Sequence, residues 1–354
     1  MSARLNIWRA RLFSGPLTSL VTIAIFALIV AIGWPLLRWA VLNADVSGAT
    51  RADCTSGGAC WVFVKQRFGQ FMYGFYPVDQ RWRIDLWAIV SIASVALLLW
   101  KNMPRRGWFA LVVILIWPPL GVWLLGGGFG LQPIETRQWG GLTLTMFLAI
   151  YAGLIAIPLG ILLALGRQSR LPVVRLISII FIEFWRGVPI IAVIFLASLL
   201  LPLIMPSGVG VDRLARAVIG LAFVISAYMA EAVRGGLQAI PTGQHEAAKA
   251  LGLNYWKATG FIILPQALRI SLPAMTNEFI ALFKNTTLVL VVSILDLLGV
   301  AQASLADPSW VGYSMEAYAF TGLIYWLICF ALSRFAKSLE TNPGQSRHRM
   351  QDAQ

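Results

Sequence analysis

The chain has 354 residues, of which 58% are hydrophobic and only 12% are charged, whereas soluble domains average about 45–50% apolar and about 25% charged residues. This composition excludes a disordered chain and a soluble enzyme, because so few charged residues would cover the surface of a soluble chain of this length poorly. The formal net charge of +13 fits either a nucleic-acid-binding protein or a membrane protein with cationic cytoplasmic loops.

Eight windows of the chain are long and apolar enough to span a bilayer, which takes about 20 mostly apolar residues. The first is not a cleavable signal peptide, because Arg38 and Trp39 follow its long apolar stretch where small residues would be needed. The windows lie near residues 18–40, 84–100, 108–125, 142–165, 174–202, 214–233, 272–298 and 317–336. We therefore predict an all-α, polytopic membrane protein with about eight transmembrane helices.

The distribution of Lys and Arg among the loops predicts the orientation of these spans. The segments on the side of the two termini carry 17 of the 28 cationic residues, the opposite segments carry nine, and Arg186 and Lys284 fall inside spans. Because cytoplasmic loops are enriched in Lys and Arg, both termini are predicted to be cytoplasmic. The positive charge is then a consequence of membrane topology, and no nucleic-acid partner is expected.

This orientation makes residues 43–83 an external loop, which contains Cys54 and Cys60. An oxidising compartment such as a periplasm would permit a disulfide between them, and two free thiols are the alternative. The third cysteine, Cys329, lies in the last span, where it is expected to pack. No metal site is predicted, because the chain has no CxxC pair and its two histidines are far apart in sequence.

The chain changes character near residue 130, after the glycine-rich segment 126–130. The three spans before this point have no charged residue at their centres, whereas later spans carry charges and helix breakers at membrane depth. We therefore predict accessory helices with the external loop in residues 1–130, a core in residues 131–340 and a cytoplasmic tail in residues 341–354.

The fifth predicted span is both interrupted and charged. Pro189 lacks the N–H that would bond the carbonyl of Trp185, and Gly187 weakens the helix further. A broken helix beside Glu183 and Arg186 could offer charges to a polar solute, the acid to an ammonium group and the guanidinium to a carboxylate. The alternative is that the two residues, three positions apart, form a structural ion pair with each other.

The seventh predicted span also carries polar residues, namely Asn277, Glu278, Lys284, Asn285, Thr286 and Thr287. Helical spacing allows only some of them to face one cavity, and threonines in helices often bond their own backbone. Asn285 is the better ligand candidate, because its amide both donates and accepts hydrogen bonds. The candidate substrate-binding residues are therefore Glu183, Arg186, Lys284, Asn285 and Thr286.

Between the sixth and seventh spans, the cytoplasmic segment 235–265 is too ordered to be a simple connector. Residues 244–251 favour a helix of about two turns, with Glu246 in its first turn and Gly252 just after its end. Asn254 can then cap a second short helix that Pro265 stops. A two-turn helix is marginal alone, and its small apolar side chains fit a groove on a partner protein better than a lipid surface.

This segment resembles the EAA loop of permease subunits of ATP-binding cassette importers. The motif is present at every defined position, with Glu246-Ala247-Ala248, Gly252, Ile262 and Leu264-Pro265. Segments 184–189, 226–236 and 277–287 are similar to those of polar amino acid importers. The three extra N-terminal spans are similar to the large permease subunits of general L-amino acid systems. The resemblance implies three accessory helices followed by a five-helix, MetI-like permease core.

The resemblance also implies a function, that of a multi-pass permease in the bacterial inner membrane. It would receive L-amino acids, with broad specificity for polar and charged ones, from a periplasmic amino-acid-binding protein. A coupling helix would contact the ATPase through Glu246, Ala247, Ala248, Gly252, Leu264 and Pro265. Two separate ATPase subunits would bind ATP, because this chain has no GxxxxGK[ST] loop. The chain itself is expected to bind no cofactor and to catalyse no reaction, and a second, homologous permease would complete a heterodimeric pore.

Two departures from the family pattern limit the prediction of substrate. Val188 replaces a common threonine, and Asn285 replaces an acidic residue, which weakens the case for cationic substrates. An ion-coupled secondary amino acid transporter, with Glu183 and Lys284 as charges of its gate, is the alternative function. A membrane-embedded enzyme is not favoured, because no Ser/His, HExxH or paired-carboxylate signature is present.

Overall fold

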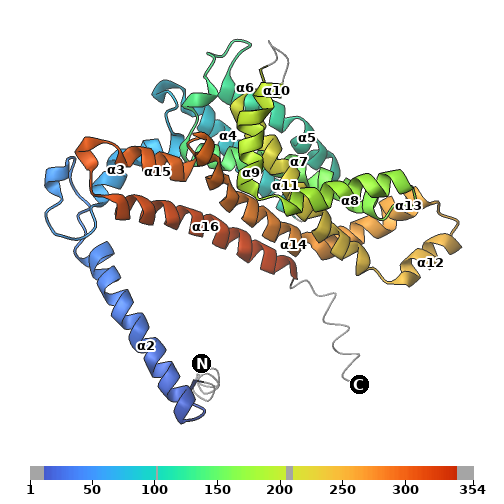
Figure 1. The fold of residues 1–354 in the computed structure, drawn as a ribbon, viewed down its shortest axis with the longest axis horizontal. Helices are drawn as coiled ribbons and strands as arrows, with labels where there is room; N and C mark the ends of the chain where they lie inside the picture. The colour runs from blue at the N-terminus through green and yellow to red at the C-terminus, as the bar shows by residue number, and fades with distance from the viewer. Residues whose placement is uncertain (1–11, 101–102, 205–209, 341–354) are drawn as a thin grey trace. The chain divides into compact units, whose positions relative to one another are not determined.

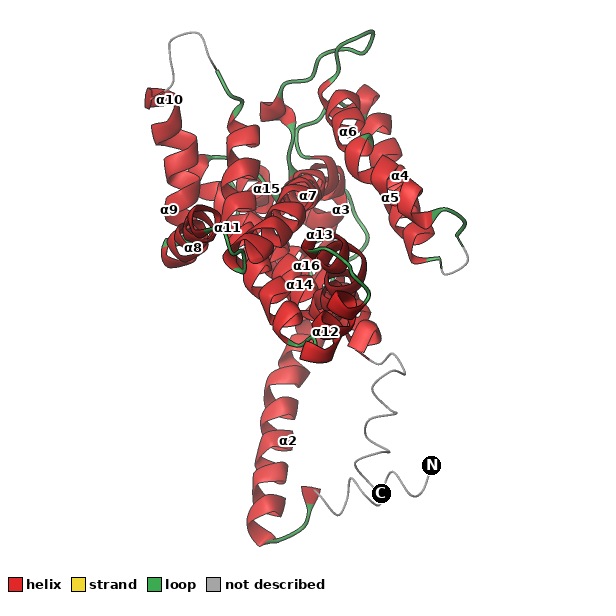
Figure 2. Cartoon of the chain, turned by 90° about the vertical axis from the view of Figure 1, so that its right-hand side faces the viewer, coloured by secondary structure: helices red, strands yellow, loops and turns green. Residues whose placement is uncertain are grey.

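The structure, a computed structural model, describes residues 12–100, 103–204 and 210–340, and these residues form helices and loops without strands (Figures 1 and 2). The helices are α2 (Pro16–Leu37), α3 (Trp61–Tyr73), α4 (Trp82–Leu99), α5 (Arg106–Leu115), α6 (Trp117–Gly126), α7 (Gly141–Arg167), α8 (Pro172–Gly187), α9 (Ile190–Phe195), α10 (Leu201–Ile204), α11 (Arg213–Gln238), α12 (Thr242–Ala250), α13 (Tyr255–Ala258), α14 (Leu264–Asn285), α15 (Leu297–Leu305) and α16 (Ser314–Glu340). The predicted all-α fold is confirmed. The predicted tail, residues 341–354, lies outside the described residues.

The predicted spans correspond to helices, but their number is approximate. Within the described ranges, six helical stretches are long and apolar enough to cross a bilayer: Pro16–Leu42, Gly107–Gly126, Gly141–Arg167, Arg213–Gln238, Tyr255–Val292 and Ser314–Ser338. A seventh crossing results if the bent pair of α8 with Ile190–Ile204 counts as one span. The remaining predicted window, 84–100, is the 18-residue helix α4, which is not among these candidates.

The chain divides into two compact units. Unit 1 contains Met1–Phe68 and Ser304–Phe320, and unit 2 contains Gly69–Ala303 and Thr321–Gln354. Helices α4, α5 and α6 therefore belong to the same unit as α7, α11 and α14. The domain boundary predicted near residue 130 lies inside unit 2.

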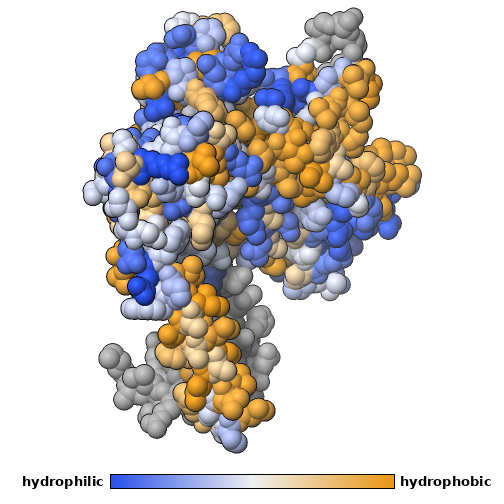
Figure 3. Space-filling model, turned by 60° about the vertical axis from the view of Figure 1, so that its left-hand side comes forward, coloured by the Kyte–Doolittle hydropathy of each residue, from blue (hydrophilic) through white to orange (hydrophobic). Residues whose placement is uncertain are grey.

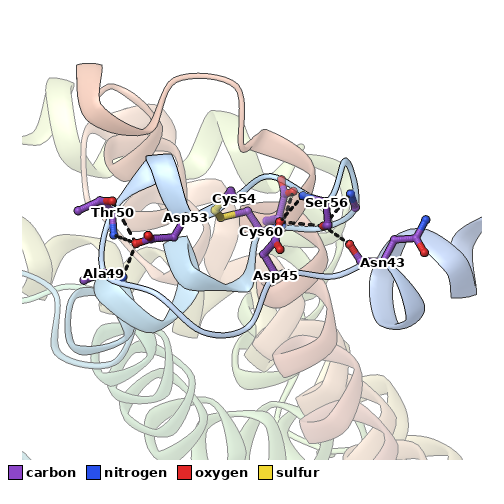
Figure 4. Close-up of a disulfide and its surroundings, with 10 residues drawn as sticks. Asn43, Asp45, Ala49, Thr50, Asp53, Cys54, Ser56 and Cys60 are labelled. Carbon is purple, nitrogen blue, oxygen red and sulfur yellow. Dashed lines mark hydrogen bonds between the residues drawn. A yellow bond between two sulfur atoms is a disulfide. The ribbon is translucent and has the colours of Figure 1, made fainter.

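In unit 1, the loop that follows α2 is closed by a disulfide between Cys54 and Cys60, whose Cα atoms lie 5.6 Å apart (Figure 4). Ser56, between the two cysteines, donates hydrogen bonds to the Asp45 carboxylate from its amide at 3.0 Å and from its hydroxyl at 2.8 Å. The amide and then the hydroxyl of Ser56 hold the pKa of Asp45 below its usual value. The loop is thus an ordered turn with its own polar contacts.

The interior of unit 1 joins α3 to the segment 304–320. Phe63 is fully buried, with its ring 5.5 Å from that of Trp310. The backbone amide of Cys60 donates to the buried Glu316 carboxylate at 3.1 Å, and Arg67 forms an ion pair with Asp307. Apolar packing and polar contacts therefore both connect two segments that are far apart in sequence.

Helix α2 presents an apolar surface along its whole length. None of its residues is buried within the described chain, and Figure 3 colours most of this helix as hydrophobic. A helix that is apolar all round is stable in lipid or against another apolar protein surface, not in water. This agrees with a membrane span.

Helix α11 is the centre of unit 2, where it packs against α7, α8, α9 and α14 (Figure 1). Helices α7 and α11 run in the same direction, because Thr136 before α7 bonds Asp212 before α11, and Arg167 at the end of α7 bonds Glu231 late in α11. Helix α12 follows α11 after three residues. Helix α12 therefore lies at the opposite end of unit 2 from the loop 127–140 (Figure 2).

The fifth predicted span is broken at the predicted place. Helix α8 ends at Gly187, α9 begins at Ile190, and the two helices are bent by 103°. Val188 and Pro189 between them have extended ψ angles of 130° and 132°. The missing N–H of proline and the conformational freedom of glycine explain the break.

The prediction for Pro265 was wrong. Asn254 does cap α13, because its side chain accepts a hydrogen bond from the Lys257 amide at 2.9 Å. Pro265, however, lies in the first turn of α14, and the chain continues as one helical stretch from Tyr255 to Val292. A π-helical segment at residues 259–263 precedes the proline and avoids the clash that a regular α-helix would produce there.

Candidate functional site

Charged side chains from α7, α8 and α11 form a single ion cluster in unit 2, which consists of Arg167, Glu183, Arg186, Glu231 and Arg234. Glu231 lies at its centre: Oε1 accepts from Arg167 at 2.8 Å, and Oε2 accepts from Arg234 at 2.6 and 2.9 Å. Arg167 also contacts Glu183 at 2.9 Å. Because three guanidinium groups face two carboxylates, the cluster carries one surplus positive charge.

Arg186 is the least tightly paired member of this ion cluster. Its Nη1 atom lies 4.0 Å from Oε2 of Glu231, and its guanidinium lies 5.9 Å from the centre of the Tyr228 ring. The Arg186 side chain is 39% exposed, whereas that of Glu231 is 18% exposed. The surplus charge therefore belongs to a group that a carboxylate-bearing ligand could reach.

The predicted alternative of a Glu183–Arg186 pair is wrong. Among the described residues, Glu183 forms its ion pair with Arg167 of α7, and Arg186 points towards Glu231 of α11. The two side chains that flank the break therefore bind neighbouring helices instead of each other. This arrangement ties the last turn of α8 to α7 and α11.

The other three predicted substrate-binding residues lie apart from the ion cluster. Thr286 is fully buried, and its hydroxyl donates to the Phe283 carbonyl at 2.8 Å. Lys284 is exposed. Asn285, half-buried, ends α14. Of the five predicted residues, only Glu183 and Arg186 belong to the ion cluster.

A second polar group, centred on the fully buried Asp296, lies at the start of α15. Asp296 accepts hydrogen bonds from the Gly299 amide at 2.9 Å and from the Tyr325 hydroxyl at 2.8 Å. Beside it, Thr145 of α7 accepts from the Leu297 amide at 2.9 Å. These contacts join α7, α15 and α16, so we assign this group to the stability of the bundle.

The predicted coupling segment forms an exposed helix, α12. Glu246 and Ala247 are exposed, and Gly252 after the helix has a φ of +70°, which glycine adopts without strain. Glu246 lies in the second turn, not the first, because α12 begins at Thr242. Ala248 is only 1% exposed and faces the chain itself, not a partner.

Near this helix, Leu264 is half-buried, whereas Pro265 is exposed. Sequence reasoning missed Trp256 of α13, which is 77% exposed. Leu251, five residues earlier, is 75% exposed. Large apolar side chains on both sides of a helix-ending glycine, in a segment predicted to be cytoplasmic, could have indicated this surface. Such exposed apolar groups are typical of a protein contact.

A cavity of about 760 Å³ lies at the other end of α11, lined in part by Trp123, Phe129, Arg137 and Arg213. None of the predicted site residues lines it. Arg213 and Glu231 are separated by five turns of α11, about 27 Å along the helix axis. The cavity and the ion cluster are therefore separate features.

Glu231 is the central residue that sequence reasoning missed. It is the one acidic residue of the predicted span 214–233, and an acid within an apolar span is a functional candidate by default. That signal was available in the sequence. Its main partner, Arg167, is distant in sequence, so only the folded chain identifies the pair.

Comparison with known proteins agrees with this architecture. Residues 156–342 match the family model of the binding-protein-dependent transport system inner membrane component. The chain is 51% identical to the inner membrane amino-acid ABC transporter permease protein YhdY of Escherichia coli (strain K12), over 98% of this chain and 96% of that protein.

Two further relatives cover different shares of the chain. The glutamate/glutamine/aspartate/asparagine transport system permease protein BztC of Rhodobacter capsulatus is 35% identical over 94% of this chain and 92% of that protein. This chain is also similar to a solved structure described as the crystal structure of an amino acid ABC transporter with histidines. The sequence identity is 32%, the match covers 56% of this chain and 91% of the solved chain, and the TM-score is 0.50. The resemblance predicted from the EAA segment is thus confirmed, and the chain belongs to the family of inner membrane components of binding-protein-dependent transport systems.

Proposed function

We propose that this chain is the permease subunit of an ABC importer that moves polar and charged L-amino acids into the cytoplasm. The observation that carries the proposal is the 51% identity to an amino-acid ABC permease, which extends over both the N-terminal helices and the core. The exposed helix α12 at the EAA motif supports it, because a permease needs a surface on which an ATPase can act. The chain itself would bind no cofactor and would not hydrolyse ATP.

The proposed assembly contains two ATPase subunits, a periplasmic amino-acid-binding protein and a second, homologous permease in a heterodimer. Both termini would be cytoplasmic in a bacterial inner membrane. The location of 17 of 28 cationic residues on one side supports this orientation. The disulfide of Cys54 and Cys60 supports it as well, because the loop would then lie in the oxidising periplasm.

The proposed coupling surface is the exposed side of α12 with the residues that follow it. Glu246, Ala247, Gly252 and Pro265 would contact the ATPase, and Leu251 and Trp256 would add apolar contact area. Leu264 and the buried Ala248 would instead support the helix from the side of the permease. The small residues of α12 would allow close approach to a groove.

The proposed solute contacts are at the break between α8 and α9. Arg186 would receive the substrate carboxylate, because it holds the surplus positive charge of the ion cluster and is partly exposed. Glu183, whose side chain is 54% exposed, would receive the ammonium group. Asn285 would contribute hydrogen bonds, with Lys284 and Thr286 in secondary roles, if α14 turns towards the pathway during transport.

The test is uptake of radiolabelled L-glutamate, L-glutamine and L-arginine by proteoliposomes that contain the whole complex with its binding protein. We expect uptake only with ATP, and Glu246→Arg should reduce it at least tenfold without loss of the permease from the membrane. Glu135→Arg is the matched control, because Glu135 is exposed at the opposite end of unit 2. Uptake driven by an ion gradient without ATPase subunits would instead establish a secondary transporter.

The solute contacts have their own test within the same complex. Arg186→Gln should raise the KM for uptake at least tenfold, because the substrate carboxylate loses its cation. Arg175→Gln, on the same helix and exposed, is the control and should leave KM within twofold. Unchanged KM for Arg186→Gln would remove Arg186 from the pathway.

A further inference from the structure

Glu231 lies near the end of α11 that leads to α12. It lies seven residues before the end of α11 at Gln238, which corresponds to about 10 Å along the helix. Only Ala239, Ile240 and Pro241 separate α11 from α12, and Ile240 is 7% exposed. A displacement of α12 would therefore reach Glu231 through a short, packed connection.

Helix α12 also contacts the first turn of α14. Ala248 is buried, and the Gln266 side-chain amide donates to Gln244 of α12 at 3.3 Å. Helix α11 in turn lies close to α14, because a Cβ atom on Gly236 would be 2.4 Å from the Ala267 carbonyl oxygen. A displacement of α12 would therefore reach α11 through α14 as well as through residues 239–241.

From Glu231, the ion cluster leads directly to the break in the fifth span. Arg186 lies on the last turn of α8, and Glu183 is bound to Arg167, which Glu231 also binds. Just beyond, no atom lies within 4 Å of the place that a Cβ atom on Gly187 would occupy. The helix that follows is bent by 103° relative to α8. Such a junction is a hinge that can absorb a change in backbone angles.

We propose that Glu231 is a positioning residue that transmits the movement of α12 to the broken helix α8–α9. It acts through Arg167, which contacts its Oε1 atom at 2.8 Å, and through Arg186, which lies 4.0 Å from its Oε2 atom. A push on α12 moves α11, Glu231 draws the two arginines with it, and the end of α8 shifts relative to α9. This proposal rests on the proposed function.

The composition of the ion cluster favours transmission over simple stabilisation. Charged groups inside a membrane protein are costly, and apolar residues of similar volume often stabilise a fold as well or better. Glu231 instead binds Arg167 of α7 through Oε1 and Arg234 of its own helix through Oε2. It also faces Arg186 of α8 at 4.0 Å, and Arg186 carries the surplus charge. An ion cluster that links three helices can shift between two arrangements more easily than interlocked apolar side chains.

The experiment measures amino acid uptake and ATP hydrolysis together, in proteoliposomes that contain the whole complex and its binding protein. The probe is radiolabelled L-glutamate, with L-glutamine in a parallel assay. We expect Glu231→Gln to keep ATP hydrolysis within about twofold of the wild type while uptake per ATP hydrolysed falls at least fivefold. The control Glu135→Gln removes an exposed carboxylate of unit 2 and should keep the wild-type ratio.

A second variant decides the question if Glu231→Gln fails to assemble. Arg167→Gln removes the positive charge whose Nη1 atom contacts Glu183 at 2.9 Å and Glu231 at 2.8 Å, so we expect a similar fall in the same ratio. The proposal would be overturned if the assembled variant takes up as much amino acid per ATP hydrolysed as the wild type, whether or not both activities fall. Absence of ATP-driven uptake in the wild type would instead contradict the proposed function.

Discussion

Gly236 of α11 lies directly against Ala267 of α14, so closely that a Cβ atom on Gly236 would be 2.4 Å from the Ala267 carbonyl oxygen. No side chain fits at that distance without a shift of one helix. Gly235, its neighbour in sequence, has no atom within 4 Å of the equivalent position. Small residues at such crossings allow membrane helices to pack closely.

The first prediction follows from this contact. Gly236→Ala should destabilise the permease by roughly 1–3 kcal/mol, because the added methyl group separates two packed helices. Gly235→Ala should be neutral or slightly stabilising, since alanine favours a helix. The thermal unfolding midpoint of the complex in detergent measures both, and equal midpoints for the two variants would contradict the packing described here.

The second prediction concerns the buried hydrogen bond between Tyr325 and Asp296. Tyr325→Phe should cost about 1–3 kcal/mol of stability, because it removes a donor from a fully buried carboxylate. Tyr318→Phe, at an exposed position of the same helix, is the matched control and should change stability by less than about 0.5 kcal/mol. Thermal unfolding in detergent distinguishes the two. If both variants have the thermal unfolding midpoint of the wild type, the hydrogen bond does not stabilise the bundle.

The third prediction concerns the break after α8. Pro189→Ala restores the missing N–H, so α8 and α9 should straighten towards one continuous helix. Spin labels at Ile177 and Leu199, both exposed, would then approach a separation of about 33 Å, greater than in the bent wild type. Pro172→Ala, in the first turn of α8, should leave the distance unchanged. An unaltered distance in Pro189→Ala would mean that tertiary packing alone maintains the bend.

The fourth prediction concerns the disulfide of unit 1. A maleimide reagent added to the denatured, unreduced protein should label one cysteine, Cys329, and should label three after reduction. Cys54→Ser should expose Cys60 to the reagent without reduction. Labelling of all three thiols in unreduced protein from the native membrane would contradict the bridge.

The loss of the disulfide has a local consequence. The loop 43–60 of Cys54→Ser should be cleaved by protease at least several times faster than in the wild type, because the closed turn that holds Ser56 against Asp45 opens. Cys329→Ser is the control and should leave the cleavage rate unchanged, since Cys329 has no disulfide partner.

Much of the fold could be predicted because its signals are local. Runs of apolar residues determine most of the spans, and the break at Gly187 and Pro189 follows from the chemistry of those two residues alone. The prediction for Pro265 failed because a proline can begin a helical turn as well as end one. Local sequence does not distinguish these two uses when a π-helical turn precedes the proline.

The candidate site was harder to predict, because it depends on contacts between residues that are distant in sequence. Glu183 and Arg186 were identified as charges at membrane depth, but their partners were not. Lys284 and Thr286 share a helical stretch with Glu278, yet Thr286 is buried and bound to its own backbone. Helical spacing alone does not show which face of α14 packs against α7 and α11.

The sequence by itself determined that this chain is a membrane protein, and its EAA motif determined the family, because composition and motif spacing are properties of the chain alone. The tertiary structure decided which charges pair: Glu231 holds Arg167 and Arg234 and faces Arg186 across three helices. It also decided that Ala248 faces inward. The physical reason is that an ion pair requires its atoms to lie within about 4 Å, and only the packing of the helices sets such distances.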